Sequence, residues 1–451
     1  MAPFRGCFRM PPDDCPANQA TCPGPIAPNW RLRMDMRPRP VRERRIYCIR
    51  VMNMPYKRGQ RARRIRRRMR YGSSRIRRRM RSGPYHAAGR RQGWLEGWRL
   101  GACRRIADDT PPPAARRRPW RVMYVPQGFD AIDRGVVAAL GETTHLIVAP
   151  QAEMLSYAEI YRPDAVLVMN GLHTFPANQR EQVEGIRRLG IKTAIWFVDD
   201  PYVSGDSAEI APSYDYVFTH ERSCVQRYVE LGCAQAYHLP LAADQELFRP
   251  MAVDEAYRTD ICFIGVAFRN RVELFDSIAG FLKDKKVLIA GSHWDRMSHY
   301  GQLAKFVRSG WIEVPETVKY YNGAKIVINM HRTTEPLSDN KNTRHWEGHS
   351  VNPRTFEIAS CGTLQLTDLR PELPEYYRVG HEMASFSNPR ELTEIIDYYL
   401  RNEEERLKVA ARGYRRTRAE HTFVGRVTRL LDTMGLADPA QPPAGEGWTV
   451  G

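Results

Sequence analysis

The chain has 451 residues, a length that favours two folded domains, each large enough to bury a core. Its formal net charge of +18 is distributed unevenly: residues 1–118 hold 32 Arg or Lys and 7 Asp or Glu, whereas residues 119–451 hold 37 basic and 44 acidic residues. No apolar run approaches the roughly 20 residues that span a bilayer, and no apolar secretory signal opens the sequence. We therefore expect a cytoplasmic protein without a transmembrane segment, in which a very basic leader precedes mildly acidic globular domains.

Residues 1–118 predict a basic, largely disordered leader that ends in a linker. Residues 61–81 contain 12 Arg, and such a density of like charges repels itself and cannot build a core. Three interpretations stay open: binding of nucleic acid or another polyanion by counterion release, a solvated tail, or a translation start at Met52, Met54 or Met69. Few aromatic residues interleave the Arg blocks, so base stacking is poorly supported and we favour the last two interpretations.

A stripe of small residues follows in the last part of this leader. Glycines recur at every fourth residue with two tryptophans between them: Gly89, Gly93, Gly97 and Gly101, with Trp94 and Trp98. This spacing suits close helix–helix contact, although each Gly lowers helix propensity by about 1 kcal/mol relative to Ala. We expect a helix that couples to another element or self-associates. Residues 110–119, rich in Pro and Arg, read as a linker.

Residues 119–248 show the pattern of a parallel α/β sheet. Short apolar stretches alternate with amphipathic helical segments, and we predict strands at 121–125, 146–148, 165–169, 193–198 and 216–219. In such sheets, ligands bind beyond the carboxyl ends of the strands. Four polar residues follow strand ends and should share that edge: Asn170, Asp199, Asp200 and His220.

Two adjacent acids, Asp199 and Asp200, are the candidate catalytic residues of this edge. One of them could take a proton from an acceptor hydroxyl or hold a cation. The alternative is that either carboxylate caps the turn at Pro201, which is a common use of Asp. His220 is the weaker candidate, because a His at a strand end is often hydrogen-bonded locally. The nine cysteines include no C-x-x-C pair and no His/Cys cluster at zinc spacing, so we predict reduced thiols and no metal site.

Residues 249–436 repeat the alternating pattern, and residues 437–451 read as a Pro- and Gly-rich tail. We predict strands at 260–265, 286–291, 324–329 and 363–367. The first of these ends in Gly265, with Arg269 and Arg271 just beyond it. Gly allows close backbone approach and Arg pairs with phosphate oxygens, so this turn is a candidate diphosphate site. Strand–Gly–helix turns without a ligand are also common.

A capped helix over residues 352–362 is the element around which the second half is organised. Asn352 is a strong N-cap, and Gly362 can end the helix at positive φ. Arg354 and Glu357 are i, i+3 neighbours on one face of it. They are interpreted either as a pair that binds an anion and hydroxyl groups or as an ordinary surface ion pair.

Together these residues resemble the GT-B glycosyltransferases, and more closely the CgeB-like, spore-maturation type of glycosyltransferase-like protein. The resemblance covers about 119–435 and rests on four motifs: Trp196-Phe197-Val198-Asp199-Asp200-Pro201; Phe263-Ile264-Gly265 with Arg271; Asn352-x-Arg354-x-Phe356-Glu357-Ile358-x-x-Cys361-Gly362; and Tyr398-Tyr399-Leu400 through His421-Thr422-Phe423. It implies an α/β protein with two Rossmann-like domains that face a cleft, preceded by the disordered Arg-rich leader.

The resemblance also implies a chemistry. A nucleotide-sugar donor would bind to the second domain and an acceptor to the first. In related group 1 enzymes a Glu at the position of Glu357 binds the donor ribose, and its partner eight residues earlier is usually another Glu, where this chain has His349. Arg269 and Arg271 would neutralise the diphosphate without a metal, and no cofactor is expected beyond the nucleotide-sugar co-substrate. The full predicted donor set is Gly265, Arg269, Arg271, His349, Asn352, Arg354 and Glu357.

Two functions from different classes follow. The first is a metal-independent, hexosyltransferase-like glycosyltransferase that moves a sugar from a nucleoside-diphosphate donor to an unknown glycan, protein or small-molecule acceptor, in spore or cell-surface glycosylation. The second is a catalytically inactive GT-B-fold protein of the spore coat or its assembly, which the departure at His349 motivates.

Overall fold

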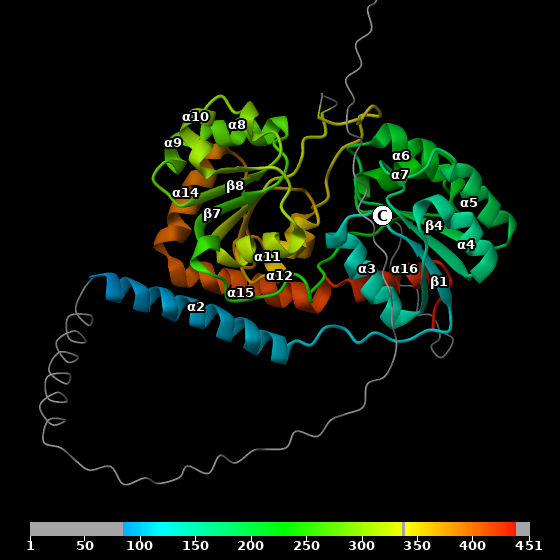
Figure 1. Ribbon diagram of the computed structural model, residues 1–451, viewed down its shortest axis with the longest axis horizontal. Helices are drawn as coiled ribbons and strands as arrows, with labels where there is room; N and C mark the ends of the chain where they lie inside the picture. The colour runs from blue at the N-terminus through cyan, green and yellow to red at the C-terminus, as the bar shows by residue number, and fades with distance from the viewer. Residues whose placement is uncertain (1–83, 336–338, 439–451) are drawn as a thin grey trace, which may run out of the picture. The chain divides into compact units, whose positions relative to one another are not determined.

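Two six-stranded sheets with helices on their faces make up most of the part of the chain that the structure describes (Figure 1). The computed structural model describes residues 84–335 and 339–438, all of which fall in one compact unit. Most of the predicted leader and nearly all of the predicted tail lie outside the described residues. The strand pairs within both sheets are parallel. The predicted α/β fold with two Rossmann-like sheets is therefore confirmed.

The first sheet has the strand order β2-β1-β3-β4-β5-β6. Its strands are β1 (Arg121–Val125), β2 (His145–Val148), β3 (Ala165–Met169), β4 (Lys192–Phe197), β5 (Tyr216–Thr219) and β6 (Ala236–His238), and its helices are α3 (Asp130–Thr143), α4 (Met154–Tyr161), α5 (Gln179–Arg188), α6 (Ser204–Ile210) and α7 (Arg222–Glu230). Val122 and Tyr124 of β1 pack in one core, and Met123 and Val125 pack in another. A strand buried on both faces needs a continuous apolar run, which is the pattern that made β1 recognisable.

The second sheet has the order β12-β11-β10-β7-β8-β9. Its strands are β7 (Thr259–Ile264), β8 (Val287–Gly291), β9 (Val307–Ser309), β10 (Ala324–Asn329), β11 (Leu364–Asp368) and β12 (Ala384–Phe386). Its helices are α8 (Arg269–Ser277), α9 (Ala279–Leu282), α10 (Tyr300–Leu303), α11 (Val314–Gly323), α12 (Arg354–Ser360), α13 (Leu373–Tyr376), α14 (Pro389–Arg401) and α15 (Glu403–Glu420). Short 3-10 helices are η1 (Gln151–Glu153), η2 (Ala211–Ser213), η3 (Glu255–Tyr257), η4 (Trp294–Arg296) and η5 (Ala304–Phe306). Ile261 and Cys262 of β7 enter opposite cores, so this sheet is also covered on both faces.

The last helix, α16 (Phe423–Thr433), packs with the first sheet although the sequence pattern placed it in the second half. Its apolar residues Phe423, Val427, Leu430 and Leu431 recur at helical spacing and join the core that contains Val122 and Tyr124. The Phe423 ring lies so close to Gly135 of α3 that a Cβ there would be 2.2 Å from it. The helix α16 thus contributes to the core of the first half.

The helix α2 (Pro84–Asp109) precedes the first sheet and packs along α15 (Figure 1). Arg99 is buried and anchors it: Nη1 donates to Asn322 Oδ1 and to the Cys361 carbonyl, both at 3.2 Å, and Nη2 donates to the Met251 carbonyl at 2.9 Å. Cys103 of α2 meets Gly362, where a Cβ would lie 2.6 Å from its Sγ. The predicted coupling helix is therefore present, and it couples to the second half.

The glycine stripe is not the contact face of α2. Gly89, Gly93, Gly97 and Gly101 are all exposed, and a Cβ added to any of them would meet nothing within 4 Å. The buried face instead carries Arg99, Cys103 and Ile106. Among the described residues the glycines therefore do not pack against another element of the chain, because the larger side chains on the opposite face make that contact; self-association through the glycines stays a prediction.

Candidate functional site

The candidate site is built around the start of α12, beyond the carboxyl end of β10. Asn352 caps the helix as predicted, since its Oδ1 accepts from the Thr355 N–H at 3.2 Å. The same amide exchanges two hydrogen bonds, of 3.0 and 2.9 Å, with the amide of Asn329, the last residue of β10. Gly362 has φ +65°, as expected for the residue that ends the helix. The strand end and the helix start are therefore fixed to each other.

His331 and Asp368 form a hydrogen-bonded pair that holds the start of α12 in place, and the sequence pattern did not predict this pair. His331 Nε2 accepts from the Asn352 N–H at 2.8 Å, so the ring proton is on Nδ1, which donates to Asp368 Oδ1 at 2.6 Å. Burial alone would raise the pKa of Asp368, but His331 and Arg370 hold it well below its usual range. The signal that could have found the pair is that each residue stands at or just after the end of a predicted strand.

Arg354 and Glu357 project from the first turn of α12 without partners. Among the described residues, neither side chain forms a hydrogen bond or an ion pair. Arg354 is half-buried, and Glu357 is only 5% exposed. Burial raises the pKa of Glu357 to about 7, although the charge of Arg354 opposes the shift. A buried carboxylate and a cation that bond to no other described side chain are available to a ligand with hydroxyl and anionic groups.

The turn after β7 is held together by the residues that were predicted to bind a diphosphate. Arg271 is buried and donates to the carbonyls of Met330, at 3.0 and 2.7 Å, and of Val266, at 3.0 Å. Burial lowers its pKa to about 9, and the nearby charge of Arg354 adds to that shift. Arg269 is exposed and pairs with Glu273 at 3.3 Å. Arg271 therefore braces the turn with three of its N–H donors.

Close packing in this turn explains why a glycine stands at position 265. Its carbonyl accepts from the indole N–H of buried Trp294 at 3.0 Å, and a Cβ on Gly291 would lie 2.1 Å from that carbonyl oxygen. A Cβ on Gly265 itself would lie 3.1 Å from Arg271 Nη1. The small residues thus allow β7 and β8 to end close together.

His349 lies in the loop between β10 and α12, which contacts the first half through Glu221. Its Nε2 is 3.0 Å from a carboxylate oxygen of Glu347, and its side chain is 41% exposed. The backbone N–H groups of His349 and Ser350 donate, each at 3.0 Å, to the carboxylate of buried Glu221 at the start of α7. Arg222 beside it pairs with Glu372 at 2.6 Å. His349, at the expected Glu position, therefore lies in a segment that hydrogen bonds hold in place, and its ring faces the carboxylate of Glu347.

Asp199 is the accessible acid at the edge of the first sheet. Its Oδ2 accepts from Asn170 Nδ2 at 2.7 Å and contacts His173 Nε2 at 3.0 Å. Burial would raise its pKa, but these two hydrogen bonds outweigh burial and hold the pKa below its ordinary value. The hydrogen bond to Asp199 in turn raises the pKa of His173. His173, 55% exposed and at φ +63°, was missed because it lies in an irregular loop with no motif around it.

Asp200 points the other way, into the core. It is fully buried and its carboxylate accepts from the hydroxyls of Ser207 at 3.0 Å, Thr219 at 2.7 Å and Tyr228 at 2.8 Å. His220 is also buried, with Nε2 2.9 Å from the Asp200 carbonyl. Both side chains are thus buried, and of the two predicted acids only Asp199 is partly exposed, whereas the carboxylate of Asp200 is bonded to three hydroxyls of the core.

Arg332, just after β10, contacts Tyr202, which follows Asp200 by two residues, so the loops after β10 and β4 meet here. The Arg332 guanidinium lies 5.1 Å from the centre of the Tyr202 ring. Burial lowers the pKa of Arg332, and the charge of Asp199 opposes that shift.

Within the described ranges no group of three His, Cys, Asp or Glu residues could hold a metal ion, and no helix there is long and apolar enough to cross a membrane.

Comparisons with known proteins show what the chain is similar to in sequence and in fold. Residues 269–432 match a family model described as glycosyl transferase-like. The chain is 29% identical over 313 residues to spore protein CgeB of Bacillus subtilis (strain 168), a match that covers 67% of this chain and 95% of CgeB. The solved structure of sucrose-phosphate synthase from Thermosynechococcus elongatus superposes with a TM-score of 0.50 and 12% identity, over 71% of this chain and 99% of that one, and shows a shared fold. The expected resemblance to GT-B glycosyltransferases and to CgeB is confirmed.

Proposed function

We propose that this glycosyl transferase-like chain moves a sugar from a nucleoside-diphosphate sugar to a hydroxyl of an acceptor. The observation that carries the proposal is the unpartnered pair of Arg354 and Glu357 beyond the carboxyl end of β10, within the segment that matches the family model. Open α/β sheets bind ligands at this edge. A nucleotide sugar offers both of the groups that the pair lacks, namely hydroxyls for the carboxylate and a diphosphate for the guanidinium.

Glu357 is the proposed ligand of the donor ribose. Its carboxylate can accept hydrogen bonds from two neighbouring hydroxyls, and each charge-assisted bond contributes about 1.5–3 kcal/mol. Arg354, one turn earlier, is the proposed diphosphate ligand in place of Arg271, which is buried and already gives three of its five N–H donors to carbonyls. When the bond between the sugar carbon and the diphosphate oxygen breaks, negative charge builds on the leaving group, and Arg354 stabilises it without a metal.

The acceptor side of the proposal rests on His173 and Asp199. The acceptor hydroxyl gives its proton to His173 as its oxygen bonds to the sugar carbon, and Asp199 orients the ring and stabilises the imidazolium that forms. Asn170 keeps Asp199 in place. The proposal includes spore or cell-surface glycosylation as the setting, since the relative that covers most of the chain is named as a spore protein.

A second candidate function is that of a GT-B-fold protein that binds a nucleotide sugar without transferring it. The observation that favours it is His349, which stands where the related enzymes usually have a Glu and is paired with Glu347. In that case the chain would act in assembly of a coat, with Arg354 and Glu357 as a binding site only.

A binding and turnover experiment separates these functions. Common nucleotide sugars are titrated into the full chain by calorimetry, and hydrolysis or transfer is followed for the donors that bind. The variants are Glu357→Gln and, as a matched control, Glu404→Gln at an exposed position of α15. We expect Glu357→Gln to raise the Kd about tenfold or more and the control to match the wild type. Binding without turnover by any acceptor class selects the second function, and no binding of any nucleotide sugar refutes both.

A further inference from the structure

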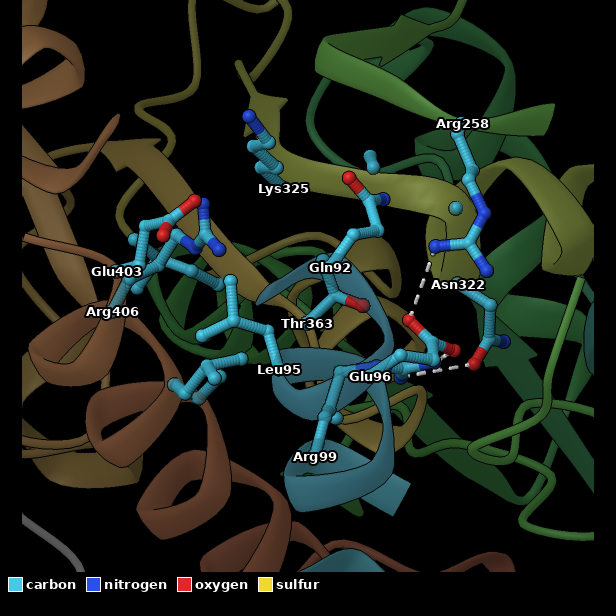
Figure 2. A pocket seen from close by; sticks show the side chains of 16 residues that line it. Gln92, Leu95, Glu96, Arg99, Arg258, Asn322, Lys325, Thr363, Glu403 and Arg406 are labelled. Carbon is cyan, nitrogen blue, oxygen red and sulfur yellow. Dashed lines mark hydrogen bonds and ion pairs between the residues drawn. The ribbon is translucent and has the colours of Figure 1, made fainter. Parts of the chain in front are cut away.

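A cavity of about 60 Å³ lies between α2 and the second half, away from the candidate site (Figure 2). Its walls include Lys325, near the start of β10, and Thr363 and Leu364, at the start of β11. The candidate donor site lies beyond the opposite, carboxyl ends of the same strands. The cavity is therefore a separate feature of the second sheet, closed on one side by α2.

Cations outnumber carboxylates on the walls of this cavity. Four cations line it, Arg99, Arg258, Lys325 and Arg406, together with two carboxylates, Glu96 and Glu403. Figure 2 shows Glu96 and Arg99 on α2 at one end and Glu403 and Arg406 on α15 at the other. Both carboxylates already have cationic partners: Glu96 pairs with Arg99 at 3.1 Å and Arg258 at 3.5 Å, and Glu403 with Arg91 at 2.8 Å. Lys325 pairs with Asp260 at 2.8 Å.

Arg406 is the cation of this set without a bonded partner. It is 5% exposed, its side chain forms no hydrogen bond or ion pair with any described residue, and its Nη1 is buried and unsatisfied. Burial lowers the pKa of Arg406 to about 10, although Glu403 and Asp260 oppose the shift. At the other end, Nε of Arg99 is also buried and unsatisfied. A buried guanidinium whose N–H donors have no bonded acceptor is unfavourable, even with two carboxylates nearby, so the cavity favours an anion that accepts from it.

We propose that this cavity binds a tetrahedral oxyanion, a phosphate group that is either free or at the end of a phosphomonoester. One water needs about 10–15 Å³ of such space, so the cavity has room for an ion of about four waters but not for a nucleoside. Arg406 supplies the main charge–charge contact and Lys325 a second. The exposed side chain of Gln92 stands at the rim, which leaves a path for the anion from solvent.

An anion held here would tie α2 to the second half. The cavity wall includes Gly362, which ends the helix that carries Glu357, and Arg99 of α2 already bonds to the adjacent Cys361 carbonyl at 3.2 Å. Binding of phosphate should therefore slow amide hydrogen exchange in residues 84–109. This readout depends on the cavity alone and not on any activity of the protein.

The test measures phosphate binding to the full chain by calorimetry and by thermal unfolding, against potassium chloride at the same ionic strength. The variants are Arg406→Gln and Arg406→Met, with Arg104→Gln at an exposed position of α2 as the charge-matched control, and Arg354→Gln to remove binding at the donor site. We expect millimolar phosphate to raise the Tm of the wild type, of Arg104→Gln and of Arg354→Gln. Either change at Arg406 should weaken binding about tenfold or more, because it removes a charge-assisted contact.

The arms of the experiment also identify the source of the phosphate group. Tighter binding of glucose 6-phosphate than of inorganic phosphate assigns a phosphomonoester, and the reverse order assigns the free ion. The proposal is overturned if phosphate changes neither the Tm nor the exchange of α2 in the wild type, which would show that the cavity holds water only. It is equally overturned if both Arg406 variants fold and bind phosphate as the wild type does. Should both variants fail to fold, the exchange measurement on the wild type still decides.

Discussion

Arg354 and Glu357 lie one helical turn apart on α12, and no ion pair joins their side chains within the described part of the chain. An i, i+3 pair of this kind on an ordinary surface helix would contribute a few tenths of a kcal/mol and carry no information about function. Here the carboxylate is buried, so an unpaired state is unfavourable for folding. Such an arrangement is typical of a site that is completed by a ligand.

The first prediction concerns pH and stability at Glu357. Its pKa of about 7 in the folded chain lies above the 4.5 of an ordinary Glu, so between these values the folded state keeps a proton that the unfolded state has released. Stability must therefore fall as pH rises from about 4.5 to about 7, by about 3 kcal/mol for a shift of this size. Glu357→Gln should remove that part of the pH dependence. The measurement is the Tm of both proteins from pH 5 to pH 8; parallel curves would contradict it.

The second prediction concerns the charge at Arg354. Because its guanidinium has no partner among residues 84–335 and 339–438, Arg354→Gln should leave the Tm unchanged but raise the Kd for a nucleoside diphosphate about tenfold or more. The loss should shrink at high salt, since screening weakens the wild-type contact. Calorimetry with the nucleoside diphosphate and with the bare nucleoside checks this. An equal rise in the Kd of both ligands would show that Arg354 does not bind the phosphates.

The third prediction uses the hydrogen bond between His173 and Asp199. Asp199 raises the pKa of His173, so Asp199→Asn should lower it, and the low-pH limb of the transfer rate should move to lower pH. The maximal rate should fall about a hundredfold or more, because the ring loses the group that orients it. The Kd for the donor should stay the same. NMR titration of His173, assigned with His173→Gln, and a pH–rate profile are the measurements, and an unmoved limb would exclude His173 as the base.

The fold was predictable because it depends on local pattern. Strands such as β1 and β4 are continuous apolar runs of five or six residues, and a strand buried on both faces leaves that signature in any single sequence. The cap at Asn352 was predictable for the same reason, since its partner Thr355 is three residues away. These two predictions, of the strands and of the cap, depend on neighbours in the sequence and were therefore correct.

Features set by distant residues were not predictable. Arg271 looked free for a phosphate, but the carbonyls that it bonds belong in part to Met330, which only the pairing of β7 with β10 brings near. Likewise Asp199 and Asp200 are adjacent in the sequence, but they lie in the turn after β4, and their hydrogen-bond partners there hold one carboxylate at the edge and the other in the core. His173 became a candidate only when the loop after β3 placed it beside Asp199.

The fourth prediction separates Asp200 from Asp199 by stability. Asp200→Ala leaves the buried hydroxyls of Ser207, Thr219 and Tyr228 without their acceptor and should lower the free energy of unfolding by about 3 kcal/mol or more. Asp200→Asn keeps one carbonyl acceptor and should cost less. Asp199→Asn, at a partly exposed position, should leave the Tm within a few degrees of the wild type. Thermal and urea unfolding of the three variants decide the order, and a fully stable Asp200→Ala protein without transfer activity would return Asp200 to the reaction.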